Sequence, residues 1–169
     1  MVHPLISQLR FARSEFRRSL DGVTDEEARR RFMPMNCISW MVGHMASQEQ
    51  SYWCDFAQGK IVAPRVSELT AHGKIASTPS LDDMWADWTT ITEQADVFLD
   101  GLTSDHLSEF FTLNGKPARE DIGTMLQRTI YHYWFHNGEA QGVRQLLGHT
   151  DLPQFVGKFS EDALYRREG

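Results

Sequence analysis

The sequence predicts an all-α protein, a four-helix bundle, and three observations support this fold class. Four long stretches repeat apolar residues at alternating steps of three and four, the spacing of one buried helix face. Ser or Thr residues that can cap a helix precede several helical segments. The chain of 169 residues is also long enough to bury a core as one domain, 1–169.

The first predicted helix begins at Pro4 and ends near Gly22. Proline suits the first turn of a helix, because its missing N–H would have no partner there. Apolar residues follow at steps of four, three, four and four: Leu5, Leu9, Ala12, Phe16 and Leu20. Thr24 and Glu27 then form the pattern of a capping box, which predicts a short helical turn through Phe32.

The second predicted helix has Ser39 as its N-cap, runs to about Ala57 and ends before Gly59. Its apolar stripe consists of Ile38, Met41, Val42, Met45, Tyr52 and Phe56. Glu49 lies on this buried stripe, where a carboxylate requires a partner or a shifted pKa. His44 lies one residue off the stripe, so we expect its ring to face an adjoining helix.

The longest connection of the chain, 58–79, follows this helix and is interrupted by Gly and Pro. It exceeds the length of a tight hairpin, so we expect it to cross over the bundle or to form the rim of a pocket. Ser80 caps the third predicted helix. The apolar residues of this helix are Leu81, Met84, Trp88, Ile91, Ala95, Phe98 and Leu102. A second connection, 103–120, leads to the last helix.

The fourth predicted helix begins near Arg119 or Glu120 and ends before Gly148. Its buried seam contains Ile122, Met125, Thr129, His132, His136, Glu139, Val143 and Leu146. His132 and His136 are four residues apart, so both imidazoles can reach one point beyond the helix surface. Two converging neutral imidazoles are typical of a metal site. The alternative is a buried hydrogen-bond network without a metal.

A five-residue pattern, Leu20-Asp-Gly-Val-Thr24, recurs as Leu99-Asp-Gly-Leu-Thr103. The recurrence suggests two related helical hairpins, in which the second helix corresponds to the fourth. His44 would then face the histidines of the fourth helix from an equivalent position. The alternative is that both segments share only the chemistry of helix ends.

Composition excludes several classes of protein. The net charge of −6 and pI near 5.6 argue against a nucleic-acid-binding surface, which needs clustered Lys and Arg. Cys37 and Cys54 form no CxxC motif, so we expect both to be small buried apolar residues and not metal ligands or a disulfide. No signal peptide or membrane span is recognisable, and the cytoplasm is the expected compartment. The tail, 149–169, is predicted to dock on the bundle and then fray.

Three motifs occur in a specific order: Trp40-Met-Val-Gly-His44 followed by Glu49 and Trp53, then His132-Tyr-Trp-Phe-His136-Asn-Gly-Glu139, then Arg144-Gln-Leu-Leu-Gly-His149. With this order and spacing, the chain resembles the DinB-like family of metal-binding four-helix bundles, which includes thiol-dependent transferases. The resemblance covers nearly the whole chain, including the tail motif 152–157.

The resemblance implies one divalent transition metal, Zn, Ni or Fe, held by His44, His132 and His136. It gives Glu139, where many relatives have Gln, a supporting role beside a ligand imidazole, and Glu49 is expected to act in the same way. It also implies an up-down-down-up bundle and a homodimer.

Two hypotheses for function follow, and no catalytic residue is assigned in either. The first is a metal-dependent enzyme that activates a low-molecular-weight thiol, as a transferase, or water, as a hydrolase. The second is a non-catalytic protein, either a stress-response metal binder or a dimeric interaction module. Imidazole ligands do not by themselves identify the metal.

Overall fold

The computed structural model describes residues 2–154, 156–157, 161 and 165. Helices dominate this part of the chain, which confirms the all-α class. The only two strands in the described part of the chain are two residues long each, and they pair as an antiparallel hairpin. The elements are α1 (Pro4–Ser19), α2 (Asp25–Arg29), α3 (Ile38–Glu49), the π-helix η1 (Gln50–Phe56), α4 (Pro64–Thr70), α5 (Leu81–Leu99), α6 (Ser104–Leu107), β1 (Thr112–Leu113), β2 (Lys116–Pro117) and α7 (Ile122–Leu146).

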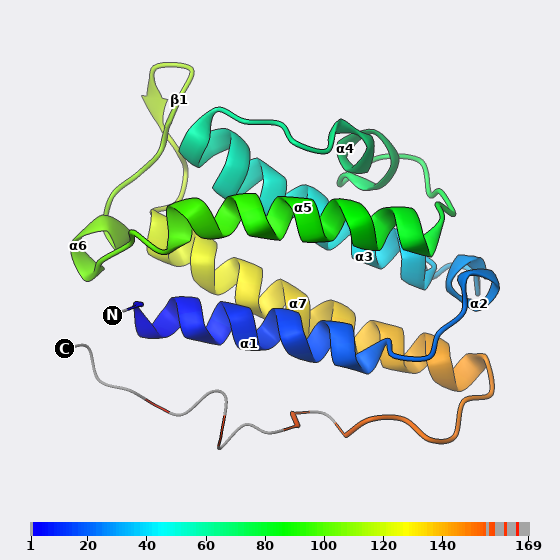
Figure 1. Ribbon diagram of the computed structural model, residues 1–169. Coiled ribbons are helices and arrows are strands. Elements are labelled where there is room, and N and C mark those ends of the chain that lie inside the picture. The colour runs from blue at the N-terminus through cyan, green and yellow to red at the C-terminus, as the bar shows by residue number, and fades with distance from the viewer. Residues whose placement is uncertain (1, 155, 158–160, 162–164, 166–169) are drawn as a thin grey trace.

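The four long helical segments lie side by side, and α3 continues without a break into η1 (Figure 1). The closest packing joins α3 to α5 and α1 to α7. Helices adjacent in the sequence are therefore not each other's main partners, so the two predicted hairpins do not form as packed pairs. Thr24 and Thr103 do occupy equivalent places, as N-caps of the short helices α2 and α6. The two helix ends therefore share the same capping chemistry, and the correspondence of the second and fourth helices stays a prediction.

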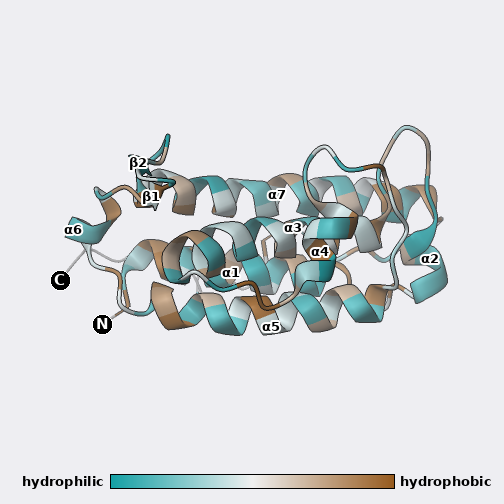
Figure 2. Cartoon of the chain, turned by 90° about the horizontal axis from the view of Figure 1, so that it is seen from above, coloured by the Kyte–Doolittle hydropathy of each residue, from teal (hydrophilic) through white to brown (hydrophobic). Residues whose placement is uncertain are grey.

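The core fills the space between these four helical segments, and hydrophobic and hydrophilic residues alternate along each of them (Figure 2). The predicted apolar stripes supply most of it. The largest side chains that are fully buried are Trp53, Tyr133, Phe16, Ile6, Leu9, Ile38, Met41, Met45, Met84, Ile91, Leu99 and Leu126. Cys37 and Cys54 are free and buried, as the sequence predicts.

Several predicted helix ends are confirmed, and others move by a few residues. The capping box of Thr24 and Glu27 is present, but α2 ends at Arg29 because Arg30 adopts an extended backbone. Ser80 caps α5 as predicted. Asp121 caps α7, so this helix begins two to three residues later than expected.

The predicted N-cap of the second helix was wrong. Cys37 takes this position, with an extended backbone (φ −80°, ψ 161°), and its carbonyl accepts the first helical hydrogen bond from Met41. Ser39 is the second residue of α3. After Glu49 the helix widens into η1, and the chain turns away at Gly59, whose φ of +65° suits glycine.

Each long connection contains structure that the sequence did not predict. The 58–79 segment carries α4, which packs on α3 and lies above it in Figure 1. The 103–120 segment carries α6 and the β1–β2 hairpin. The tail docks on α1, because the Gln154 carbonyl accepts from Arg18 and the Gly157 amide donates to Glu15. The expected frayed end lies, apart from 161 and 165, outside the described residues.

Candidate metal centre

Three imidazoles drawn from two helices meet at one place. His44 comes from α3, whereas His132 and His136 come from successive turns of α7. One nitrogen of each ring lies within 4.8 Å of the nitrogens of the other two. The Nε2 atoms of His132 and His136 are 2.9 Å apart. The structure therefore brings together the three histidines that the resemblance named.

The opposite nitrogen of each ring is held by an oxygen from a different source. His44 Nδ1 lies 2.8 Å from the Thr70 carbonyl, and His132 Nδ1 lies 2.9 Å from Gln48 Oε1. His136 Nδ1 lies 2.8 Å from a carboxylate oxygen of Glu139. Because these oxygens can only accept, each Nδ1 must carry the hydrogen, which leaves the Nε2 lone pairs free.

This donor set fits a divalent transition metal. Two lone pairs that face each other at 2.9 Å repel unless a proton or a cation lies between them. Nitrogens bound to zinc at about 2.0–2.1 Å, at right or tetrahedral angles, lie roughly 2.9–3.4 Å apart, which includes the observed separation. Neutral imidazoles suit Zn, Ni, Fe and Cu alike, so the geometry does not select one metal.

The environment keeps two of these rings neutral at pH 7. Burial, together with the neighbouring His136, lowers the pKa of His44 to about 4. Burial also lowers the pKa of His132 to about 3, again with a contribution from His136 and His44. A neutral ring keeps the lone pair that a metal requires, so both groups are ready to act as ligands.

Close packing around His44 fixes the position of its ring. Trp40, one turn earlier on α3, stacks on the imidazole at a centroid distance of 4.4 Å and an angle of 15°. Gly43 lets α4 and α5 approach α3, because a Cβ there would lie 2.5 Å from Met84 Sδ and 2.8 Å from the Thr70 side chain. This approach places the Thr70 carbonyl beside the His44 ring.

The two carboxylates expected to support the imidazoles lie in different places. Glu139 contacts His136, as described above. Glu49 is fully buried and instead pairs with the guanidinium of Arg13, while the Tyr133 hydroxyl donates to it at 2.6 Å. Trp88 in turn donates to the Tyr133 oxygen at 2.7 Å. These residues, Arg13, Glu49, Trp88 and Tyr133, form a Glu49 cluster that joins α1, α3, α5 and α7 within the core. Glu49 was expected to support a ligand imidazole, and its partners are Arg13 and Tyr133 instead.

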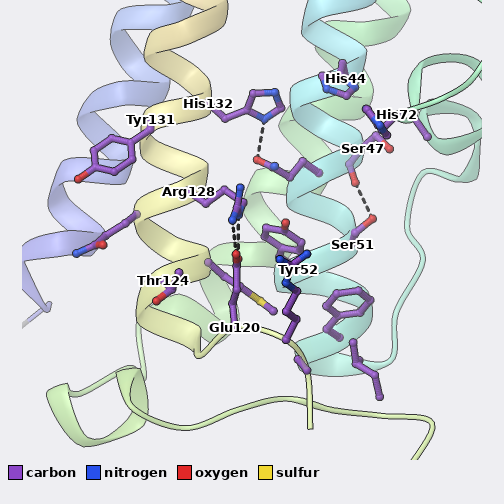
Figure 3. A pocket seen from close by; sticks show the side chains of 18 of the residues that line it. His44, Ser47, Ser51, Tyr52, His72, Glu120, Thr124, Arg128, Tyr131 and His132 are labelled. Atoms are coloured by element: carbon purple, nitrogen blue, oxygen red, sulfur yellow. Dashed lines mark hydrogen bonds and ion pairs between the residues drawn. The ribbon is translucent and has the colours of Figure 1, made fainter. Parts of the chain in front are cut away.

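A pocket of about 1200 Å³ opens beside the imidazoles, and Figure 3 shows His44 and His132 at one end of it. The lining comes from α3, η1, the 58–79 connection, the 103–120 connection and α7. The lining residues are His44, Ser47, Gln48, Ser51, Tyr52, Phe56, Ala71, His72, Leu113, Ala118, Arg119, Glu120, Thr124, Met125, Gln127, Arg128, Tyr131, His132 and Phe135. The 58–79 connection thus contributes to the wall of a pocket, which was one of its two expected roles.

Sequence reasoning missed several residues of this site. Gln48 follows His44 by four residues, and helical spacing could have placed it beside the same ligand group. Arg128 precedes His132 by four residues and could have been found in the same way. The Thr70 carbonyl carried no signal, because a backbone group is independent of residue type and α4 was not predicted.

The fold and the site together define an all-α protein with a three-histidine centre, able to hold a metal, at one end of a pocket. The family model described as Mycothiol-S-transferase matches residues 4–148, so the chain belongs to this family. The resemblance to DinB-like, thiol-transferase-related proteins is thereby confirmed. A search of curated proteins gave no match. Within the described part of the chain, no helix is long and apolar enough to span a membrane.

Proposed function

We propose that this protein is a metal-dependent thiol S-transferase, which joins the sulfur of a low-molecular-weight thiol to an electrophilic carbon. The convergence of three Nε2 lone pairs at the end of an open pocket carries the proposal. The family description names mycothiol, and this thiol is the first candidate substrate. The proposal includes His44, His132 and His136 as the metal ligands.

A divalent metal held by three neutral nitrogens would lower the pKa of a thiol towards neutrality. The residues of the chain prepare the centre for this chemistry. Gln48, Glu139 and the Thr70 carbonyl fix the orientation of the three rings and direct every free lone pair to one side. Trp40 covers one face of His44 and limits the access of water to that ring.

The pocket has room for both substrates at once. Its volume of about 1200 Å³ exceeds the roughly 300–1000 Å³ typical of a site for one small molecule. Ser47 and Ser51 add hydroxyl groups to the wall, while Tyr52 and Phe56 add apolar surface. A thiol held near the histidines would therefore have an electrophile beside it, which supplies the proximity that a bimolecular transfer needs.

The overall organisation forms a further part of the proposal. We propose that the chain is one domain, 1–169, with an up-down-down-up four-helix bundle formed by α1, α3 with η1, α5 and α7. We also propose a homodimer. Light scattering of the purified chain measures the dimer directly, and a molar mass of one chain at micromolar concentration would contradict it.

Elemental analysis tests the centre. The protein as purified should contain close to one equivalent of a divalent transition metal, and His136→Ala should lose it. His72→Ala is the matched control, because His72 lines the same pocket but is not part of the three-histidine cluster. Circular dichroism checks that each variant is folded. Full metal content in a folded His136→Ala variant would refute the ligand assignment.

Conjugation of mycothiol to 1-chloro-2,4-dinitrobenzene tests the reaction. The thiol sulfur bonds to the ring carbon, chloride leaves with the electron pair of the C–Cl bond, and the thiol proton goes to solvent. We expect turnover that is lost with a chelator and restored by the metal found in the purified protein. Full activity in the presence of the chelator, or in His136→Ala, would contradict the proposed mechanism.

A further inference from the structure

The pocket has a positively charged end, although the whole chain is acidic. Its lining contains two arginines, one glutamate and no aspartate or lysine. With neutral histidines the lining carries a net charge of +1, whereas the chain carries −6. Arg119 and Glu120 lie just before α7 and Arg128 lies in its second turn, and Figure 3 shows the Arg128–Glu120 pair between His132 and the start of the helix.

One of the two arginines is available to a ligand. Arg128 forms a two-pronged ion pair with Glu120, in which its Nε donates at 2.8 Å. This contact satisfies both groups and lowers the pKa of the Glu120 carboxyl below its ordinary value. Arg119 is exposed, and no hydrogen bond or ion pair joins its guanidinium to another residue of the described chain. The Glu120 carboxylate next to Arg119 is already bound by Arg128, so the N–H donors of Arg119 stay free for a ligand.

The spacing relates this end to the three histidines. Arg128 precedes His132 by one turn of α7, a rise of about 6 Å, and Glu120 lies beyond Arg128 on the same side (Figure 3). Apolar side chains, among them Tyr52, Phe56 and Met125, line the pocket together with these groups. The pocket therefore offers a nucleophile site, an apolar wall and a cationic group in one cavity.

We propose that Arg119, with the Arg128–Glu120 pair beside it, binds the carboxylate of the electrophilic cosubstrate. The proposal deepens the proposed function and rests on it for the role of the ligand as an electrophile. A guanidinium recognises a carboxylate through paired N–H donors, and the charge assists both hydrogen bonds. The substrate class is therefore an electrophile with an apolar body and an acid group placed away from the reacting carbon.

Binding of 4-chloro-3-nitrobenzoate and of its methyl ester tests the proposal on the metal-depleted full-length chain. The two probes share a ring and a leaving group and differ in the negative charge. Titration followed by NMR should give a dissociation constant for the acid about fivefold lower than for the ester. Arg119→Gln should remove this preference, whereas Glu120→Gln should increase it, because only the opposing charge is lost.

Arg30→Gln is the matched control, since Arg30 is exposed near α2, at the opposite end of the molecule from the start of α7 (Figure 1). This variant removes the same charge and should leave both dissociation constants unchanged. Equal binding of acid and ester, an unchanged preference in Arg119→Gln, or the same loss in Arg30→Gln would overturn the proposal. A further outcome that overturns it is the lack of saturable binding of the acid at millimolar concentration.

The two proposals fail in different ways. With metal and mycothiol present, the mycothiol sulfur displaces chloride from either probe, as in the reaction above. Each rate of conjugation is divided by the rate of the same reaction without protein. Charge-dependent binding without any conjugate would refute the transferase and leave the carboxylate site standing. Conjugation of acid and ester at equal corrected rates, with Arg119→Gln unchanged, would refute the carboxylate site and leave the transferase standing.

Discussion

Glu139 should strengthen metal binding without touching the metal. Its carboxylate accepts a hydrogen bond from His136 Nδ1 at 2.8 Å and lies largely buried, with 22% of its side chain exposed. Loss of such a partner typically weakens metal binding 10- to 100-fold. Glu139→Gln keeps an acceptor but removes the charge, so we expect about a tenfold loss, or about 1.4 kcal/mol. Glu139→Leu removes both, and we expect about a 100-fold loss.

Competition with a zinc-binding dye at pH 7.5 measures the dissociation constant of each variant. Glu93→Gln is the matched control, because Glu93 is exposed on α5 and its replacement changes the net charge equally. Urea unfolding of the metal-free proteins separates a loss of affinity from a loss of stability. If Glu139→Leu bound zinc as tightly as the unmodified chain, the reasoning about the Glu139 contact would be refuted. The same holds if Glu139→Gln were the weaker of the two.

Two further predictions concern the metal-free fold. Tyr133→Phe removes a hydroxyl that donates to Glu49 and accepts from Trp88. Urea unfolding should therefore show a free energy of unfolding lower by about 2–4 kcal/mol. A decrease below about 1 kcal/mol would contradict the role of this cluster. The pKa values of His44 and His132 are lowered to about 4 and about 3, so the unfolded chain binds more protons between about pH 6.5 and pH 3. The free energy of unfolding should therefore fall as pH is lowered through this window, and an equally steep fall in a His44→Ala, His132→Ala double variant would show that other groups cause it.

The long helices could be predicted because each carries a complete signal within itself. In α5, a Ser cap, acidic residues in the first turn and an unbroken apolar period all agree, and the helix begins where these signals place it. The α4 helix lacks such agreement, since it has only seven residues and no side-chain cap, and it depends on packing against α3. Short helices are stabilised mainly by tertiary contacts, which a single sequence does not display.

The site was predictable to the extent that its parts share a helix. His132 and His136 were paired by their spacing, whereas His44 was joined to them by the five-residue repeat and by a family resemblance. The interpretation of Glu49 failed to anticipate its partner, Arg13, because the two residues come from different helices and lie 36 positions apart. Helical periodicity shows that a carboxylate is buried, but not which cation meets it.

The dependence of His44 on the Thr70 carbonyl has a consequence for protein design. A designer who transplanted the three histidines onto a plain bundle would leave one ring free to rotate and to exchange its proton between nitrogens. The graft would need the helix Pro64–Thr70 as well, together with a glycine before the first histidine to admit it. Changing the length of the 58–79 connection would then shift the Thr70 carbonyl and so tune the centre. No side-chain substitution can replace this backbone group.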